Sequence, residues 1–219
     1  MDGFAEKDGK VVVLDMIRVI QKNKVYLSDI DGAIGDGDHG INMNKGFSLC
    51  AERLGDKAVG LSESLGTLGE ILLTEIGGSM GPIYGSFFME MSDVCKGKDA
   101  IDTQVVLDML KAGRLAVQAL GDAKVGDKTL MDTLIPAEEA FSAAMGSGKS
   151  FAACLAEMRL AAERGKDSTI DLVARIGRAS RLGERSRGAL DAGATSCFLL
   201  LDSMAGSMTK LLSACGIPK

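Results

Sequence analysis

The sequence predicts an all-α fold of about eight helices, and three observations lead to this prediction. Apolar residues recur with the spacing of one helix face, as in Leu61, Leu65, Leu68 and Leu72. Alternation of apolar and polar residues does not persist over five positions anywhere, so no half-buried strand is expected. The 28 glycines gather between the periodic segments, where they permit short connections.

In chain order, the first segment begins with valines at 11–13 that could equally open a strand, but Met16 and Ile20 continue a helical face. We expect helices at 11–29, 39–54, 61–76, 81–96, 102–121, 128–145, 149–165 and 189–213. The gaps that carry glycines and aspartates are 30–38, 77–81, 121–127, 146–149 and 176–193. Neither a linker nor an internal repeat divides the chain, so residues 1–219 are expected to form a single domain.

Composition excludes several classes of function. A net charge of −5, 4% aromatic residues and no Trp argue against nucleic-acid binding. No apolar run is long enough to span a membrane, and the N-terminus lacks the pattern of a signal peptide, so we expect a cytoplasmic protein. Five widely spaced cysteines predict reduced, mostly buried thiols, and one His cannot build a His-rich metal site.

Two segments match the residue patterns of known nucleotide-binding motifs, but the elements expected around them differ from those that the motifs require. Residues 35–40 fit the dinucleotide pattern G-x-G-x-x-G, but they follow a helical segment and carry two carboxylates that would repel a phosphate. Residues 146–150 resemble the end of a P-loop, yet the leading glycine is replaced by Ala143 and a helix precedes them. We interpret this second segment as a connection between helices.

An acidic, glycine-rich loop is the strongest candidate for chemistry. Asp31, Asp36 and Asp38 lie within eight residues, and no basic residue occurs between Lys24 and Lys45. Carboxylates this dense repel one another unless a cation lies among them. Hard oxygen ligands on a short loop suit Mg²⁺, which completes its coordination with water and substrate phosphates. The alternative is a solvated acidic loop.

Other segments favour a phosphate ligand beside that loop. Helices are expected to begin after 38, after 80 and after 127, and the N-terminus of a helix favours an anion. Positive charge is concentrated in five arginines near one another in the sequence: Arg175, Arg178, Arg181, Arg185 and Arg187. Together these features are typical of a site for a magnesium nucleotide, and they make phosphoryl transfer the leading interpretation.

Five segments also resemble the nucleotide-binding L subunit of dihydroxyacetone kinase. They read DGAIGDGDHGINMN at 31–44, GGSMGP at 77–82, GDKT at 126–129, GRASRLGERS at 177–186 and DAGATS at 191–196. They occur in the family's order and spacing over roughly residues 24–204. The resemblance implies a barrel of eight antiparallel helices, with the nucleotide, ADP or ATP, and two Mg²⁺ held at one end by the loops.

The resemblance also assigns residues to roles. The metal ligands correspond to Asp31, Asp36 and Asp38. The nucleotide contacts correspond to His39, Gly40, Ile41, Asn42, Ser79, Met80, Gly121, Leu130, Arg178, Asp191, Ala192 and Gly193. Arg178 is the predicted catalytic residue, because a guanidinium can stabilise the charge that grows on phosphate oxygens during transfer.

The chain departs from the family pattern at three places. Residues 77–81 read GGSMG where the family usually has GGASG, so the hydroxyl has moved back by one position. Arg181 stands where the family often has Tyr. Residues 187–193 read RGALDAG in place of IGHQDPG, which changes a loop expected to cover the nucleotide and to meet the partner.

The family also implies partners. There the sugar is bound covalently to a histidine of a separate K subunit, and the one histidine of this chain lies in the nucleotide motif. We therefore expect a sugar-binding K subunit, a phosphohistidine donor protein (the M subunit), and a homodimer or a heterocomplex. Two alternatives remain open: an ATP-dependent kinase subunit for another triose or tetrose, and a nucleotide-dependent regulatory module.

Overall fold

The computed structural model describes residues 3–216, and most of that range is α-helix. The helices are α1 (Lys10–Lys22), α2 (Lys24–Ile34), α3 (His39–Leu54), α4 (Leu61–Glu75), α5 (Met80–Cys95), α6 (Thr103–Ala119), α7 (Met131–Gly146), α8 (Phe151–Ser168) and α9 (Ala192–Ala214). The prediction of an all-α fold is confirmed.

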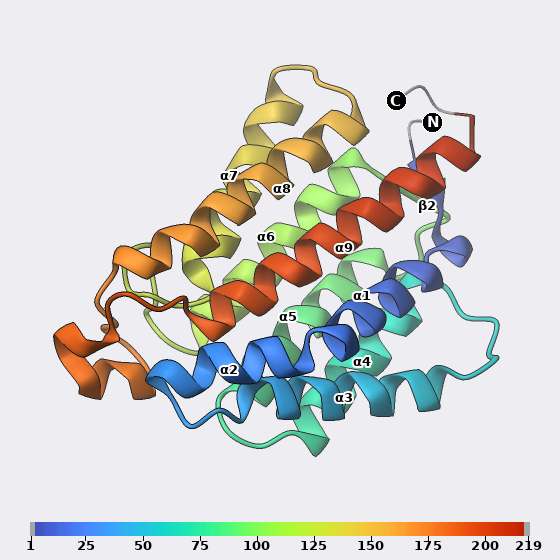
Figure 1. Cartoon of the computed structure of the whole chain (residues 1–219). Helices are drawn as coiled ribbons and strands as arrows, with labels where there is room; N and C mark the ends of the chain where they lie inside the picture. Colours follow the sequence, from blue (N-terminus) through green and yellow to red (C-terminus); the bar gives the residue numbers. More distant parts are fainter. Residues whose placement is uncertain (1–2, 217–219) are drawn as a thin grey trace.

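The helices close into a ring (Figure 1). In order, α1, α3, α4, α5, α6, α7, α8 and α9 each contact the next, and α9 contacts α1. Helix α2 continues the course of α1 and packs against α3 and α9. Neighbours in the ring run antiparallel, so the α2–α3, α4–α5, α6–α7 and α8–α9 connections all lie at one end of the barrel. We call this the loop end.

The first expected helix, 11–29, is wrong in its bounds. The chain instead forms two helices that meet at Asn23, whose backbone leaves the helical region and whose side-chain amide donates to the Val19 carbonyl at 2.8 Å. Asparagine competes for backbone hydrogen bonds in this way and favours helix ends. The described residues therefore hold nine α-helices, and Asp31, expected in a loop, lies in the last turn of α2.

Two smaller features were not predicted. A 3-10 helix, η3 (Arg178–Ser186), lies in the expected gap 176–193. Strands β1 (Gly3–Ala5) and β2 (Ala100–Asp102) form an antiparallel pair of three residues each, too short to show a period of two. Every other helix end lies within three residues of its predicted position.

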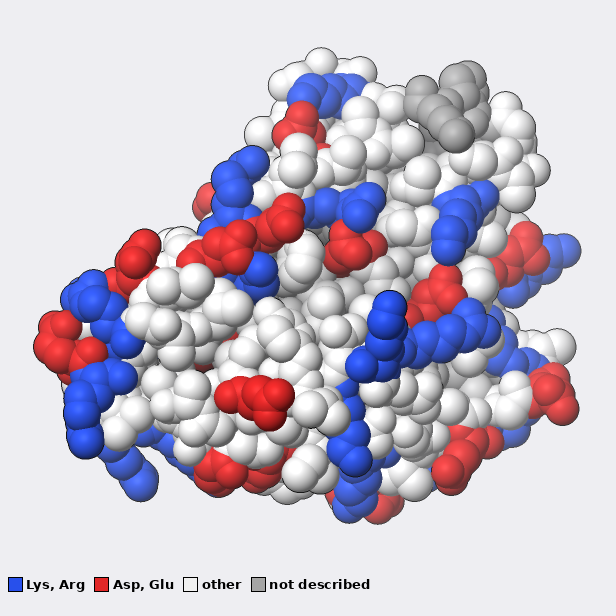
Figure 2. All heavy atoms as spheres, in the orientation of Figure 1, with Lys and Arg blue, Asp and Glu red and all other residues white. Residues whose placement is uncertain are grey.

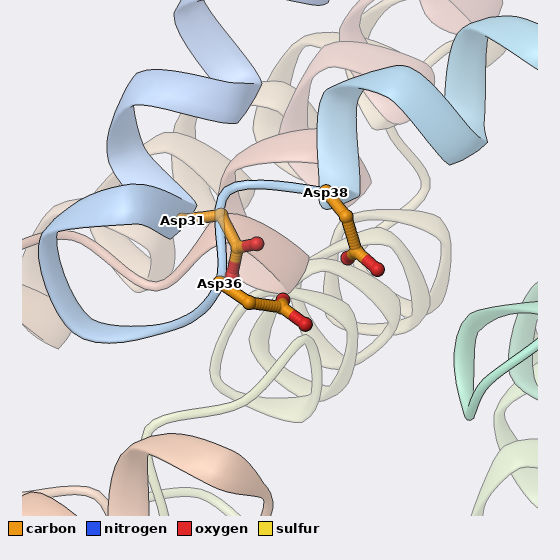
Figure 3. Close-up of side chains that lie close together, drawn as sticks. All are labelled: Asp31, Asp36 and Asp38. Carbon is orange, nitrogen blue, oxygen red and sulfur yellow. The ribbon is translucent and has the colours of Figure 1, made fainter.

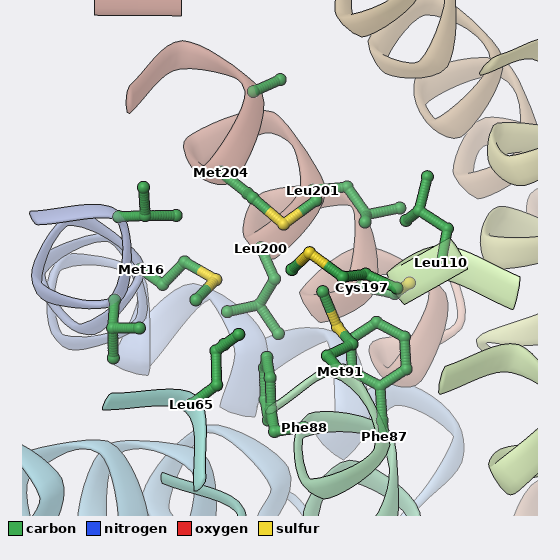
Figure 4. Close-up of a cluster of buried hydrophobic side chains, with 14 of the residues drawn as sticks. Met16, Leu65, Phe87, Phe88, Met91, Leu110, Cys197, Leu200, Leu201 and Met204 are labelled. Carbon is green, nitrogen blue, oxygen red and sulfur yellow. The ribbon is translucent and has the colours of Figure 1, made fainter. Parts of the chain in front are cut away.

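Apolar side chains from around the ring fill its interior (Figure 4). Met16, Leu65, Phe88, Leu110 and Leu200 come from five different helices, and each is at most 2% exposed. One continuous core includes residues from all nine helices. All five cysteines are free thiols, four of them buried, as predicted. None of the described helices is both long and apolar enough to cross a bilayer.

Gly69 on α4 lies where α4 packs closely against α5, so a substitution there tests this contact. A Cβ at this position would lie 2.9 Å from both the Gly85 carbonyl oxygen and the Met89 nitrogen of α5. We predict that Gly69→Ala lowers the free energy of unfolding by about 1–3 kcal/mol, because the two helices must separate.

The control is Gly206→Ala on α9, where nothing lies within 4 Å of the added carbon. Because alanine is the better helix former, this variant should be more stable by about 0.5–1 kcal/mol. Urea denaturation of both variants measures the difference. Equal effects would contradict the close approach of α4 and α5.

Candidate functional site

The three predicted metal ligands converge at the loop end (Figure 3). Asp31 projects from the last turn of α2, Asp36 from the connection to α3, and Asp38 from the position just before α3. One carboxylate oxygen of each lies within 4.8 Å of those of the other two. Asp31 is half-buried, whereas Asp36 and Asp38 are exposed.

Glycines allow the chain to bring these carboxylates together. Gly37 has a φ of +76°, in the left-handed region that side chains disfavour, so the loop can reverse between Asp36 and Asp38. A Cβ on Gly40 would collide with the Lys24 carbonyl oxygen, so glycine there lets α3 approach α2. The backbone N–H of His39 donates to Asp31 at 3.3 Å, which ties the start of α3 to the end of α2.

The donor set fits magnesium. Opposite ligands of an octahedral Mg²⁺ lie about 4.2 Å apart, twice the usual metal–oxygen distance. At most one pair among three ligands can be opposite, and adjacent ligands lie about 3 Å apart, so the carboxylate oxygens, within 4.8 Å of one another, would draw closer by side-chain rotation to share an ion. Their oxygen-only chemistry and their exposure to the cleft leave positions for water and phosphate.

The opposite wall of the site is the beginning of α5. A cleft of about 170 Å³, open to solvent, separates the acidic cluster from residues 77–80. At this helix start the N–H groups of Met80 and Gly81 have no acceptor within the helix, and residue 82 is a proline without an N–H. Such an end attracts an anion, so the cleft has a carboxylate wall and an anion-binding wall.

Arg178 closes the third side of the cleft. It begins η3 and forms an ion pair with Asp36. Ile176 and Ala179 of the same segment also line the cleft. All five arginines of the predicted cluster are exposed. Figure 2 shows basic side chains gathered at the edge of the molecule where this segment projects in Figure 1.

His39 is held from the interior of the barrel. Its Nε2 lies 2.9 Å from the Ser196 hydroxyl of α9, which lies 2.7 Å from the Tyr84 hydroxyl of α5. Burial lowers the pKa of His39 to about 4, although Asp31 opposes the shift, so the imidazole is neutral at pH 7. The sequence does not mark Tyr84 or Ser196 as partners of His39, because only the tertiary fold brings them together.

The predicted nucleotide contacts separate into two groups. Cleft-lining members are His39, Asn42, Ser79, Met80 and Arg178. The members that do not line it are Gly40, Ile41, Gly121, Leu130, Asp191, Ala192 and Gly193. Gly40 is buried against α2, and Ile41 is 53% exposed.

The predicted residues near α9 are tied to the cleft indirectly. The Asp191 carboxylate caps α9 by accepting the Ala194 N–H at 2.7 Å. Burial raises the pKa of Asp191 to about 7, Asp132 adds to the shift, and the Ala194 N–H and Lys128 oppose it. The Gly193 carbonyl accepts from the hydroxyl of Ser196, the partner of His39, at 3.1 Å.

A buried polar cluster behind the cleft was also missed. Lys128 and Asp132 are each 1% exposed, and Asp127 is 4% exposed. Asp132 accepts the backbone N–H groups of Gly126 and Thr129, which fixes the loop before α7. The sequence marked residues 126–129 as a helix start and as a segment that resembles the family, but nothing in their order signals that the lysine is buried.

Comparison with known proteins agrees with this geometry. The DAK2 domain family model matches residues 33–206. The ADP-binding subunit DhaL of PEP-dependent dihydroxyacetone kinase 2 from Listeria innocua is 38% identical over 91% of this chain and 93% of that protein. The DhaL subunit of the Escherichia coli PEP-dependent enzyme is 37% identical over 82% of this chain and 86% of that protein.

The fold has a counterpart among solved structures. The dihydroxyacetone kinase from C. freundii, in complex with AMP-PNP and Mg²⁺, matches with a TM-score of 0.66 and 22% sequence identity. The match covers 90% of this chain and 33% of that one, and it concerns the fold alone. From the family model and the DhaL relatives together, the chain belongs to the DAK2 domain family and groups there with the DhaL subunits of dihydroxyacetone kinase.

Proposed function

We propose that this chain is the nucleotide-binding subunit of a dihydroxyacetone kinase, or of a kinase for a related short ketose. It would hold ADP or ATP with Mg²⁺ and pass the phosphoryl group to a sugar on a separate K subunit. One observation carries the proposal: three carboxylates within 4.8 Å of one another face the free N–H groups of a helix start across an open cleft. The DhaL names of the relatives support ADP as the ligand.

Each wall of the cleft has its own part in this proposal. Asp31, Asp36 and Asp38 would hold Mg²⁺, with two ions expected from the resemblance. The bound metal would neutralise charge on the phosphate oxygens. The N-terminus of α5, with Ser79 beside it, would bind phosphate oxygens through backbone N–H groups. This arrangement tolerates the shifted hydroxyl at 79, because backbone donors do not depend on the side chain.

Arg178 would change partners during binding. In the structure its guanidinium pairs with Asp36, one of the proposed metal ligands. A cation that binds the Asp36 carboxylate would release the arginine from its ion pair. The guanidinium could then donate two parallel hydrogen bonds to phosphate oxygens in the same cleft. This exchange would let Arg178 act as the catalytic residue, because its guanidinium would then stabilise the charge that grows on the phosphate oxygens during transfer.

The nucleoside end of the ligand is expected deeper at the loop end. Gly121, Leu130, Asp191, Ala192 and Gly193 remain predicted contacts. The proximity of Gly193 to the cleft is supported by Ser196, which bonds both His39 and the Gly193 carbonyl. The continuous core supports the single domain predicted over 1–219, whose first two and last three residues lie outside the described range.

A partner must supply the sugar site. The one histidine of the chain is half-buried and bonded to Ser196, so it is not free to bind a ketose covalently. We therefore propose that activity requires a K subunit, with a phosphohistidine protein as donor, in a cytoplasmic complex. A homodimer or a heterocomplex is the expected assembly, and phosphorylation of dihydroxyacetone with and without each partner tests this requirement.

The acidic cluster is tested by Asp36→Asn and Asp38→Asn. We predict that each weakens Mg²⁺-dependent ADP binding by about tenfold or more, since the amide keeps the shape and loses the charge. The circular dichroism spectrum should remain all-α. Asp29→Asn is the matched control, because Asp29 is exposed on α2 and lies outside the cluster. Unchanged calorimetric ADP affinity in both cluster variants would remove the metal assignment.

Ligand binding should stabilise the fold. Mg-ADP at a hundred times its dissociation constant contributes about 2.7 kcal/mol, or roughly 5–10 °C in Tm for a chain of this length. EDTA should reverse the shift, because the phosphates would then face bare carboxylates. Differential scanning fluorimetry measures both effects. A Tm that does not move at saturating nucleotide would argue against a site at the loop end.

Arg178→Lys separates transfer from binding. Lysine keeps the charge without the fork, so we predict that turnover with the partner falls by about tenfold or more while ADP affinity falls less. Arg181→Ala is the control, since Arg181 does not line the cleft and should leave ADP binding intact. If the lysine variant turns over at the normal rate, Arg178 has no catalytic role.

A further inference from the structure

Lys128 is an unusual buried residue. It is only 1% exposed, and its backbone has a φ of +62°, the only positive value at a non-glycine position among the described residues. Its ammonium donates to two backbone carbonyls, those of Thr169 and Ala189, the second at 2.5 Å. A buried ammonium and a left-handed backbone both cost free energy, so the surrounding fold must hold them in place.

The Thr169 and Ala189 carbonyls flank the two ends of one loop. We call residues 170–188 the Arg178 loop. Next to the lysine contacts, the Gly188 N–H donates to the Ile170 carbonyl at 2.8 Å, and the Asp191 N–H donates to the Thr169 hydroxyl at 3.0 Å. Lys128 thus reaches from the α6–α7 connection into the neck of a loop that projects from the loop end (Figure 1).

The charge of Lys128 is balanced around that neck. Burial lowers the pKa of Lys128, and Arg187 adds to that effect, whereas the carboxylates of Asp191, Asp132 and Asp171 favour the ammonium. The cleft lining does not include Lys128, and its donors point at carbonyls of the neck. Direct contact with a phosphate is therefore not its role in this arrangement.

We propose that Lys128 is a positioning residue that ties the neck of the Arg178 loop and so keeps Arg178 over the acidic cluster. Arg178 is otherwise exposed, and its partner is the similarly exposed Asp36. Such a pair alone holds a loop weakly. Two charge-assisted hydrogen bonds from a desolvated ammonium hold it more strongly, because no water competes for them.

Hydrogen exchange measured by mass spectrometry on the full chain tests the tie without reference to activity. In Lys128→Met, exchange in residues 170–190 should be faster by about tenfold or more, while α4 and α5 keep wild-type protection. Lys124→Met, an exposed lysine of the same connection, should change neither region. Unchanged exchange in the loop, or faster exchange throughout the barrel, would overturn the proposal.

Lys128→Gln covers the case in which the methionine variant does not fold. Glutamine keeps an N–H donor, so its loop should exchange at a rate between those of the wild type and the methionine variant. If the glutamine variant also fails to fold, Lys128 supports the whole barrel and the local role is excluded.

The effect on turnover rests on the proposed function and is read from a double-mutant cycle. Lys128→Met should lower turnover with the partner by about tenfold in the wild-type background and very little in Arg178→Ala, because both changes remove the same placement. Equal losses in both backgrounds would contradict action through Arg178. If the chain showed no kinase activity at all, the exchange result would still decide whether Lys128 ties the loop.

Discussion

The mutual repulsion of three carboxylates is the constraint on which the loop end depends. Each pair within 4.8 Å opposes folding by about 1 kcal/mol even in water, and by more where Asp31 is half-buried. Without a ligand, the ion pair between Arg178 and Asp36 offsets part of this charge. The same repulsion would favour binding of a cation under the proposed function, and the exposed sides of the carboxylates would leave that cation open to phosphate.

The antiparallel ring explains why the other groups needed for phosphate lie at the same end. Helices α3, α5, α7 and α9 all begin at the loop end, so the positive ends of four helix dipoles lie at the same end as the acidic cluster, and those of α3 and α5 border the cleft. The hydrogen-bonded series Tyr84–Ser196–His39 joins α5, α9 and α3 just behind the cleft. Lys128 joins the α6–α7 connection to the α8–α9 connection. The site is therefore held by contacts between connections that are distant in the sequence.

What the sequence predicted well is local. Asp31, Asp36 and Asp38 are neighbours in the chain, and helix periodicity placed most helix ends within three residues. The break at Asn23 was missed because one asparagine does not interrupt an apolar face, and the placement of Asp31 in a loop was wrong for the same reason. Tyr84, Ser196 and the burial of Lys128 were beyond reach, since each depends on which helices become neighbours. Their roles are set by tertiary contacts, whereas the carboxylates carry a signal in their own spacing.

The central claim is that this chain carries the nucleotide while a partner carries the sugar. The most direct test loads the purified chain with Mg²⁺ and nucleotide and measures phosphorylation of dihydroxyacetone by the chain alone and with a sugar-binding K subunit. Each mixture is assayed with and without a phosphohistidine donor or ATP. We predict product only when the K subunit is present, and none after Mg²⁺ is removed. Product from the chain alone, or no product from the complete mixture while nucleotide stays bound, would contradict the claim.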